Sequence, residues 1–373
     1  MKSMIWTLPT RLFHWMLVVY LLIMLLTAQE ESWLRWHVAF GYGVAVLLGF
    51  RLVWGMVGPR YARFQSWPLS VQALQAFLRT IREPKIIYPG HNPAASWVML
   101  GMLVTLLFVV ITGVLTYGVQ EGRGLFAFLN ATWFKEMELF EEMHEWLTTL
   151  LWILVALHLG GVASDRVLHP QHDTLRSIFT GYKQIEATSA QTTRMQRWIA
   201  GLFLATALLL PIAVITVDET PLTQSHFASV DYESEHPLFV EECASCHTLY
   251  PPFLLPQKSW ERMMETLADH FGDDASLDEV SRRAIERYLT ENSAEHSTKE
   301  VAVYILQSID EKKDIIAITQ TPYWKERHSA LDDALFKSKN VRTKANCKAC
   351  HRGFEQGWIE DSAIAVPAQG VQR

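Results

Sequence analysis

Five long apolar stretches, separated by polar connections, dominate the first 217 residues of the chain. Each has about the length of the roughly 20-residue helix that crosses the hydrocarbon core of a bilayer. The stretches are Leu12–Ala28, Val38–Val57, Trp97–Leu115, Trp146–Ala163 and Trp198–Val217. After residue 217 the sequence is more charged and has no comparable run. The pattern predicts a transmembrane domain over residues 1–217 and a second, globular domain over residues 218–373.

The second domain is expected to be mainly helical. Two capping boxes, which begin at Ser276 and Ser297, predict helices over 277–290 and 298–308. In the connection between the second and third apolar stretches, Ser70–Arg82 alternates apolar with polar and basic residues, as in an amphipathic helix on a membrane surface. The predicted fold class is therefore all-α. It comprises a five-helix transmembrane bundle, of which four helices form the core, followed by a mainly helical domain.

Lys and Arg are distributed unevenly among the connections. The N-terminus and the 2–3 and 4–5 connections contain twelve of them, whereas the 1–2 and 3–4 connections contain three. Because positive residues accumulate on the cytoplasmic side, the N-terminus is expected in the cytoplasm. After five crossings, residues 218–373 are then outside it. We therefore predict a protein of the bacterial inner membrane with a periplasmic C-terminal domain.

The net charge also differs between the two parts. Residues 1–217 carry a net charge of +4 and residues 218–373 a net charge of −10. An acidic outer domain is typical of a protein that binds a basic partner, although the same charge also serves solubility. We expect a soluble partner with a basic docking face outside the cytoplasm.

All four cysteines occur in two Cys-x-x-Cys-His motifs. This motif is typical of c-type haem attachment, in which two thiols bond to the haem vinyl groups and the histidine becomes an axial iron ligand. The alternatives are a reduced cysteine pair or half of a zinc ribbon. Two copies, each with the trailing histidine and no cysteine left over, favour two covalent c haems. The residues are Cys243, Cys246, His247, Cys347, Cys350 and His351.

Four histidines lie in or beside the apolar stretches, where ionisable side chains are functional candidates. His144 and His158 are 14 residues apart, so they share one helix face about 21 Å apart along the axis. By depth, His14 matches His158 and His37 matches His144. Each pair can hold a b-type haem between helices. The alternative for each histidine is an interfacial or hydrogen-bonded role.

Four segments of this part resemble a known family: "WTLPTRLFHWMLV", "WHVAFGYGVAVLLGFRLVWGMVGPRYARF", "GHNPAASWVMLGMLV" and "MHEWLTTLLWILVALHLGGVASDRVLH". Over residues 5–183 the chain is similar to the bacterial di-haem membrane cytochrome b family, which includes the b subunits of nickel–iron hydrogenases. The resemblance implies a bundle that holds two bis-histidine haems and exchanges electrons with quinone. The matching positions are His14, His37, His144 and His158.

The sixth coordination position of each c haem iron decides its function. A second strong ligand there makes an electron carrier, whereas an open position permits substrate binding. The candidates are His226, His236, His270, His296, His328 and the pair Met263–Met264. The two methionines lie in an amphipathic pattern and are expected to belong to the core.

Residues 238–357 resemble the dihaem cytochrome c family in "ECASCHTLYPPFLLPQKSWERMMETLADHFGDDASLDE", "YWKERHSAL" and "NCKACHRGFEQG". The resemblance implies bis-histidine coordination of both haems. It places His270 opposite the first haem and His328 opposite the second, with His296 as the alternative to His328.

Several other polar residues near the predicted cytoplasmic surface of the membrane have two alternative roles each. Arg51 can neutralise a haem propionate or extend to the interface. His91, His169 and His172 are expected as solvated loop residues, although any of them can assist proton transfer at a quinone.

Together these features predict an electron-transfer protein with two b haems and two c haems. We expect it to oxidise membrane quinol and to pass electrons to a periplasmic acceptor, a soluble redox protein with a basic docking face. The alternatives are reverse flow from a periplasmic donor to quinone, an anchor subunit of a larger dehydrogenase, and a terminal reductase or gas-binding protein. The absence of nucleotide-binding and nucleophile motifs argues against hydride transfer, phosphoryl transfer and hydrolysis, and no nucleic-acid partner is expected.

Overall fold

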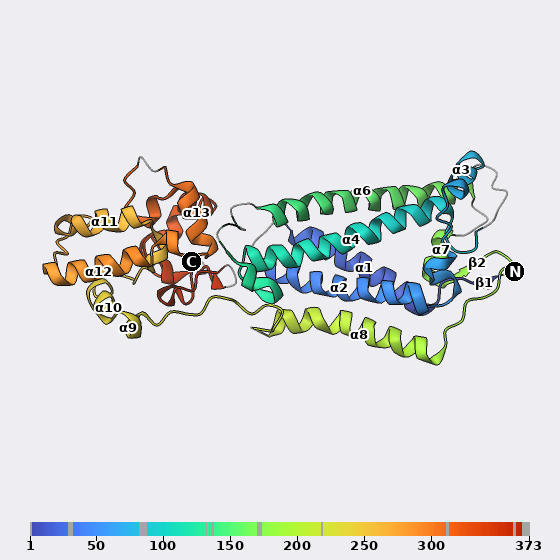
Figure 1. Ribbon diagram of the computed structural model, residues 1–373, viewed down its shortest axis with the longest axis horizontal. Coiled ribbons are helices and arrows are strands. Elements are labelled where there is room, and N and C mark those ends of the chain that lie inside the picture. The colour runs from blue at the N-terminus through green and yellow to red at the C-terminus, as the bar shows by residue number, and fades with distance from the viewer. Residues whose placement is uncertain are drawn as a thin grey trace, which may run out of the picture. The chain divides into compact units, whose positions relative to one another are not determined.

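A computed structural model describes residues 2–28, 33–81, 88–131, 133, 135, 138–169, 174–217, 219–310, 313–360 and 363–367. The described residues form two compact units. The first unit contains the described residues within 1–118, 124–126 and 137–224. The second unit contains the described residues within 119–123, 127–136 and 225–373. The described residues are mostly helical, which confirms the predicted all-α class (Figure 1).

Five long helices make up most of the first unit, and each is long and apolar enough to cross a membrane. They are α1 (Leu8–Thr27), α2 (Leu34–Val57), α4 (Pro93–Val119), α6 (Leu139–Leu168) and α8 (Arg194–Thr216). All five predicted spans are therefore confirmed as helices. Each helix begins before its apolar stretch, and α4 and α6 also end beyond theirs. Helix α6 begins at Leu139 because Glu141 and Glu142 favour a helix N-terminus while they interrupt the apolar pattern.

Helix α2 is the centre of this bundle and packs against α1 and α8. A Cβ at Gly43 would lie 2.7 Å from the Tyr20 ring and 3.0 Å from Pro211, so only glycine allows this close approach. The Tyr20 hydroxyl donates to the Ala207 carbonyl oxygen at 2.9 Å and joins α1 to α8. The same hydrophobic core includes residues of α4 and α6, so all five long helices contribute to it.

Short elements close the end of the bundle that carries the N-terminus (Figure 1). Strand β1 (Ser3–Met4) pairs antiparallel with β2 (Tyr182–Lys183), and helix α7 spans Thr174–Thr180. The predicted amphipathic helix is confirmed as α3 (Val71–Arg79), with the Ser70 side chain accepting a hydrogen bond from the Ala73 amide. Two 3₁₀ helices lie in the same connection, at Arg60–Ala62 and Phe64–Ser66.

The second unit is built from short helices around several small hydrophobic cores. Its α-helices are α9 (Tyr232–Glu235), α10 (Pro237–Cys243), α11 (Gln257–Glu265), α12 (Glu279–Glu291), α13 (Glu300–Ser308), α14 (Pro322–Arg327) and α15 (Asp333–Phe336). Its 3₁₀ helices are Pro252–Leu254, Leu267–Asp269, Ala294–His296, Ile318–Gln320, Cys347–Ala349 and Phe354–Gln356, and a further one spans Gly124–Leu129 at the boundary of the units. Met264 is buried in one of these cores, which confirms the expectation for that residue.

The two predicted capping boxes are wrong in detail. Helix α12 begins after Asp278, whose carboxylate accepts hydrogen bonds from the amides of Val280 and Ser281. Helix α13 begins after Lys299 without a side-chain cap. An aspartate two residues nearer the helix replaces Ser276 as the cap because it satisfies two of the unpaired amides of the first turn at once.

An ion pair between Arg123 and Glu360 joins distant segments of the second unit. The Ser225 hydroxyl also donates to the Glu360 carboxylate, at 3.0 Å. Glu360→Gln is expected to lower the free energy of unfolding of this unit by about 1–3 kcal/mol, because a largely buried guanidinium loses its carboxylate. Denaturant unfolding of the full-length protein, followed by c-haem circular dichroism, measures the loss.

The exposed pair Arg262–Glu265 supplies the control for this change. Glu265→Gln is expected to alter stability by less than about 0.5 kcal/mol, because solvent screens the charges. Equal losses in the two variants would contradict a structural role for Glu360.

Candidate haem-binding site

The two Cys-x-x-Cys-His motifs lie in the second unit at ends of short helices. Cys243 is the last residue of α10, and Cys347 is the first of the 3₁₀ helix Cys347–Ala349. All four cysteines are free of disulfides. Burial raises the pKa of Cys243 and of Cys347 to about 12, so both thiols are neutral at physiological pH. A neutral thiol is a poor nucleophile, which argues against a nucleophilic catalytic role for either cysteine.

His270 lies opposite the histidine of the first motif. The ring centroids of His247 and His270 are 6.1 Å apart, and the rings are 20° from parallel. The Nδ1 of His247 donates to the Thr248 carbonyl oxygen at 2.7 Å, which leaves Nε2 to coordinate a metal. A turn with positive φ at Phe271 and Gly272 follows His270. Burial, reinforced by His247, lowers the pKa of His270 and so favours the neutral imidazole that a metal requires.

The second motif has an equivalent arrangement. The ring centroids of His328 and His351 are 6.1 Å apart. His328 stacks on Trp324 and donates from Nδ1 to the Trp324 carbonyl oxygen at 2.8 Å, which fixes the ring in place. Burial lowers the pKa of His328 as well. The alternative ligand, His296, ends the 3₁₀ helix Ala294–His296, and the ring that faces His351 is that of His328.

The two remaining histidine candidates of this unit have other contacts. His236 stacks on Tyr288 with centroids 4.5 Å apart, and its Nδ1 accepts a hydrogen bond from the Phe239 amide at the start of α10. His226 contacts the ring of Phe227. Because Nδ1 of His236 accepts this bond, the neutral ring carries its proton on Nε2, which is the opposite tautomer to that of His247 and His328.

In the first unit, His37 of α2 and His144 of α6 form a third pair, with ring centroids 6.4 Å apart. The Nδ1 of His144 lies 3.0 Å from the Val109 carbonyl oxygen and 3.2 Å from the Thr112 hydroxyl. The Nδ1 of His37 lies 3.3 Å from the Thr27 hydroxyl. Both rings are thus held through Nδ1, as metal-binding histidines usually are.

His14 of α1 and His158 of α6 form the fourth predicted pair. The two imidazoles are close enough to interact electrostatically. The Nδ1 of His14 is buried and has no hydrogen-bond partner among the described residues. Three of the four pairs predicted by depth or by resemblance therefore have rings that face each other, and the fourth pair lies within electrostatic range.

The spacing within three of these pairs fits a haem iron between the rings. An imidazole nitrogen lies about 2 Å from a bound metal, so two rings that share one metal have centroids roughly 6 Å apart. Direct contact between imidazoles would bring the centroids closer than this, as the 4.5 Å stack of His236 on Tyr288 illustrates. The residues present therefore fit bis-histidine haem.

Gly113 of α4 gives a specific test of the His144 position. A Cβ on Gly113 would lie 2.9 Å from Cε1 of His144, closer than real Cβ atoms come. We expect Gly113→Ala to displace the imidazole and to lower the content of one b haem several-fold, measured by the pyridine haemochrome spectrum. Misplacement of a metal ligand by a fraction of an ångström has effects of this size.

Gly101→Ala on the same helix is the matched control. Its Cβ would lie 3.6 Å from Leu154, which is ordinary van der Waals contact. Haem loss of similar size in both variants would mean that α4 tolerates no added methyl group. The effect of Gly113→Ala would then not be evidence for the position of His144.

Two histidines expected as solvated loop residues are not solvated. His169 is 5% exposed, and its Nδ1 lies 3.2 Å from the Asp165 carboxylate. The His91 ring packs against Trp6 and Trp67. His91 is covered by aromatic rings and His169 is bonded to a carboxylate of the preceding helical turn, and neither contact appears as a local apolar run in the sequence. His172 lies outside the described residues.

Comparison with known proteins places both haem regions in families. The model of prokaryotic cytochrome b561 matches residues 5–181, and the model of dihaem cytochrome c matches residues 239–358. The first part is similar to the probable Ni/Fe-hydrogenase B-type cytochrome subunit of Bradyrhizobium diazoefficiens. The two are 25% identical over 214 residues, which cover 47% of this chain and 83% of the relative. The probable Ni/Fe-hydrogenase 1 B-type cytochrome subunit of Escherichia coli K12 is 25% identical over 188 residues, covering 41% and 78%.

The second part is similar to solved dihaem cytochromes. The diheme cytochrome c from Rhodobacter sphaeroides is 38% identical, with coverage of 35% of this chain and 99% of that one and a TM-score of 0.31. The diheme cytochrome from Shewanella baltica is 26% identical, covers 35% and 92%, and has a TM-score of 0.29. The two family matches enclose all four histidine pairs.

Proposed function

We propose a function for a chain that belongs to the prokaryotic cytochrome b561 family over residues 5–181 and to the dihaem cytochrome c family over residues 239–358. It oxidises membrane quinol and reduces a soluble acceptor. It is a membrane protein and an electron-transfer haem protein. The proposed haem complement is two b haems and two c haems. The proposed division is a b domain over residues 1–217 and a c domain over residues 218–373.

The observation that carries the proposal is the repeated spacing of facing imidazoles. Three pairs have centroid distances of 6.1–6.4 Å, and the fourth pair is close enough to interact electrostatically. The proposed ligand pairs are His14 with His158, His37 with His144, His247 with His270, and His351 with His328. Six-coordinate iron favours electron exchange over binding of a substrate, which argues against a terminal reductase.

The haems, when bound, supply reversible one-electron exchange at iron. The chain holds them and keeps the ligands neutral and oriented. In His144, His247 and His328, Nδ1 hydrogen bonds to backbone carbonyl oxygens fix the tautomer that leaves Nε2 for the metal. The thiols of both motifs fix the c haems covalently.

Aromatic residues pack the two c motifs together. The Tyr250 ring lies 5.1 Å from His247 and 5.9 Å from Phe354, and the Phe354 ring lies 6.4 Å from His351. The Tyr250 hydroxyl donates to the Ala345 carbonyl oxygen at 2.5 Å, two residues before Cys347. The two sites are therefore held at a fixed separation, as transfer between them requires.

Residues 218–373 carry a net charge of −10, which supports an acceptor with a basic face. Oxidation of one quinol releases two electrons and two protons, so two one-electron acceptor molecules are reduced for each quinol. The excess of Lys and Arg in the N-terminal, 2–3 and 4–5 connections supports a bacterial inner membrane location, with the N-terminus in the cytoplasm and the c domain in the periplasm.

Anaerobic addition of a quinol to the oxidised, full-length protein tests the proposal. The absorption bands of b and c haems are followed separately by stopped flow. We expect the b haems to be reduced first and the c haems afterwards. Fast reduction of the c haems by a soluble donor, followed by quinone reduction and with no reaction from quinol, would reverse the direction. Reaction only after a larger dehydrogenase is added would favour the anchor-subunit function.

A further inference from the structure

A buried cationic side chain lies in helix α2 near the end of the bundle that carries the N-terminus. Arg51 is 9% exposed. Its Nη1 donates to the Ala62 carbonyl oxygen at 3.2 Å, and its Cζ lies 4.7 Å and 5.0 Å from the ring centroids of Phe64 and Trp67. Among the described residues no carboxylate forms an ion pair with it. A charge held inside the protein in this way is costly unless an anion approaches it.

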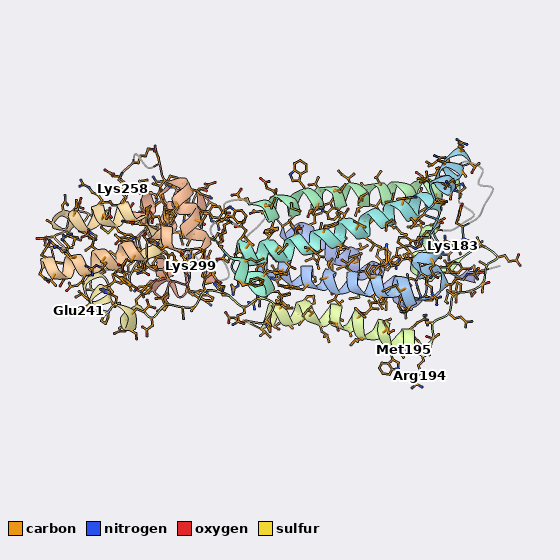
Figure 2. All side chains as sticks on the ribbon, viewed as in Figure 1. Lys183, Arg194, Met195, Glu241, Lys258 and Lys299 are labelled. Carbon is orange, nitrogen blue, oxygen red and sulfur yellow. The ribbon has the colours of Figure 1, made fainter. Side chains whose placement is uncertain are left out.

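A second buried cation, Lys183 of strand β2, lies at the same end (Figure 2). It is 6% exposed, and its Nζ donates to the Gly90 carbonyl oxygen at 3.1 Å. Burial lowers the pKa of Lys183 to about 8, although Asp165 acts in the opposite direction. Asp165 is itself bonded to His169.

His91 packs against two tryptophan rings, each of which lies beside one of these cations. Its ring centroid is 4.7 Å from that of Trp6 and 5.5 Å from that of Trp67. The Lys183 Nζ lies 6.0 Å from the Trp6 ring centroid and the Arg51 Cζ 5.0 Å from that of Trp67. The Nδ1 of His91 and the Nε1 of Trp67 are buried and have no hydrogen-bond partner within the described part of the chain. An indole N–H is a donor only, so Trp67 requires an acceptor at this place.

The cluster is beside one of the proposed haem ligands. Phe13 and Phe50, the sequence neighbours of His14 and Arg51, have ring centroids 5.6 Å apart, so His14 and Arg51 lie at the same level of α1 and α2. His91 and His14 are both within electrostatic range of His158. A b haem between His14 and His158 would bring two carboxylates, which are acceptors and anions at once. Arginine and lysine paired with carboxylates form the stronger, charge-assisted type of hydrogen bond.

We propose that Arg51, Trp67, His91 and Lys183 form a cradle for the propionates of the b haem held by His14 and His158. The inference rests on the proposed function for the identity of these ligands. The cradle supplies two cations and an indole donor, which satisfy two carboxylates. It also raises the potential of this haem, because positive charge beside iron favours the reduced state.

Redox titration of the full-length protein tests the cradle. The haem held by His158 is first identified as the b component missing in His158→Ala. Arg51→Gln is expected to shift the electron equilibrium of that haem at least tenfold toward the oxidised form, which for one electron corresponds to about 59 mV. Lys183→Met is expected to act in the same direction, and Trp67→Phe, which removes only the N–H donor, to act less. The other b haem and both c haems keep their potentials.

Arg35→Gln is the matched control. Arg35 lies on the same helix, near its other end, and donates to the carbonyl oxygens of Val214 and Val217. This variant is expected to leave the potential of the His158 haem unchanged. Equal shifts in the Arg35 and Arg51 variants, or no shift in Arg51→Gln and Lys183→Met, would overturn the proposal.

Haem dimethyl ester, which lacks the propionate charges, provides a second measurement if Arg51→Gln loses haem. Loaded with the ester, the wild-type protein is expected to resemble Arg51→Gln in its lowered haem occupancy, and the substitution then adds little to that loss. The potential is expected to move in the opposite direction, upward, because the ester removes negative charge and leaves the cations in place. A full additional loss of occupancy on Arg51→Gln in the ester form would overturn the cradle.

Failure of the cradle is distinguishable from failure of the proposed function. Loss of quinol oxidation in Arg51→Gln, with unchanged haem content and potentials, would assign the cluster to quinone and overturn the cradle alone. In the opposite case, quinol does not reduce the protein, but Arg51→Gln still shifts the potential of the His158 haem. That result would overturn only the proposed direction of electron flow.

Discussion

His270→Ala is expected to change the first c haem from low spin to high spin while the haem stays attached to the chain. The thioether bonds depend on Cys243 and Cys246, which the substitution does not touch. The imidazole that faces His247 at 6.1 Å is removed, so iron keeps one strong ligand. The variant is expected to bind one carbon monoxide per reduced protein, whereas the wild type binds none. Electron paramagnetic resonance and carbon monoxide titration measure the change.

His236→Ala is the control for this prediction, because His236 is another histidine of the same unit and stacks on Tyr288 instead of facing a motif. It is expected to keep both c haems low spin, with a small loss of stability from the uncapped end of α10. A low-spin first haem in His270→Ala would transfer the ligand role to another residue.

His144→Ala is expected to remove one of two b haems and to interrupt electron flow from quinol to the c haems. Loss of an outer partner of a metal ligand usually costs about 10–100-fold in metal affinity, and loss of the ligand itself costs more. The ratio of b to c haem should fall from about one to about one half. Reduction of the c haems by quinol should slow more than a hundredfold, while dithionite still reduces them.

His169→Gln is the control, since His169 is buried in the same unit and bonds to Asp165. It is expected to keep both b haems. Two b haems in His144→Ala would show that the pairing by depth is wrong for this site, and equal loss in the two variants would indicate a general effect on folding.

The limits of the sequence predictions have physical causes. The five spans were predicted because a bilayer demands long apolar helices, but their ends were not, since the charged first turn of α6 hides its start. The cap of α12 was assigned to Ser276 because a capping box is a local pattern. In the structure Asp278 takes this role, since it reaches two amides from one position.

His91 and His169 show a different limit. Their position in connections between the spans predicts solvent exposure for both. His91 is instead covered by Trp6, from the N-terminal segment, and by Trp67, 24 residues earlier in the same connection. His169 is paired with Asp165 one helical turn earlier. These contacts depend on how the chain folds around each histidine, and the local sequence pattern does not show them.

The sequence by itself determined the motif cysteines, the five spans and the two depths at which histidines occur, because covalent attachment, bilayer thickness and helical period are local constraints. Only the tertiary structure decided which rings face one another and at what distance, as with His328 rather than His296 opposite His351. It alone also placed Lys183 and Arg51 beside the two tryptophan rings that pack against His91, because these residues come from segments of the chain that meet only in the folded protein.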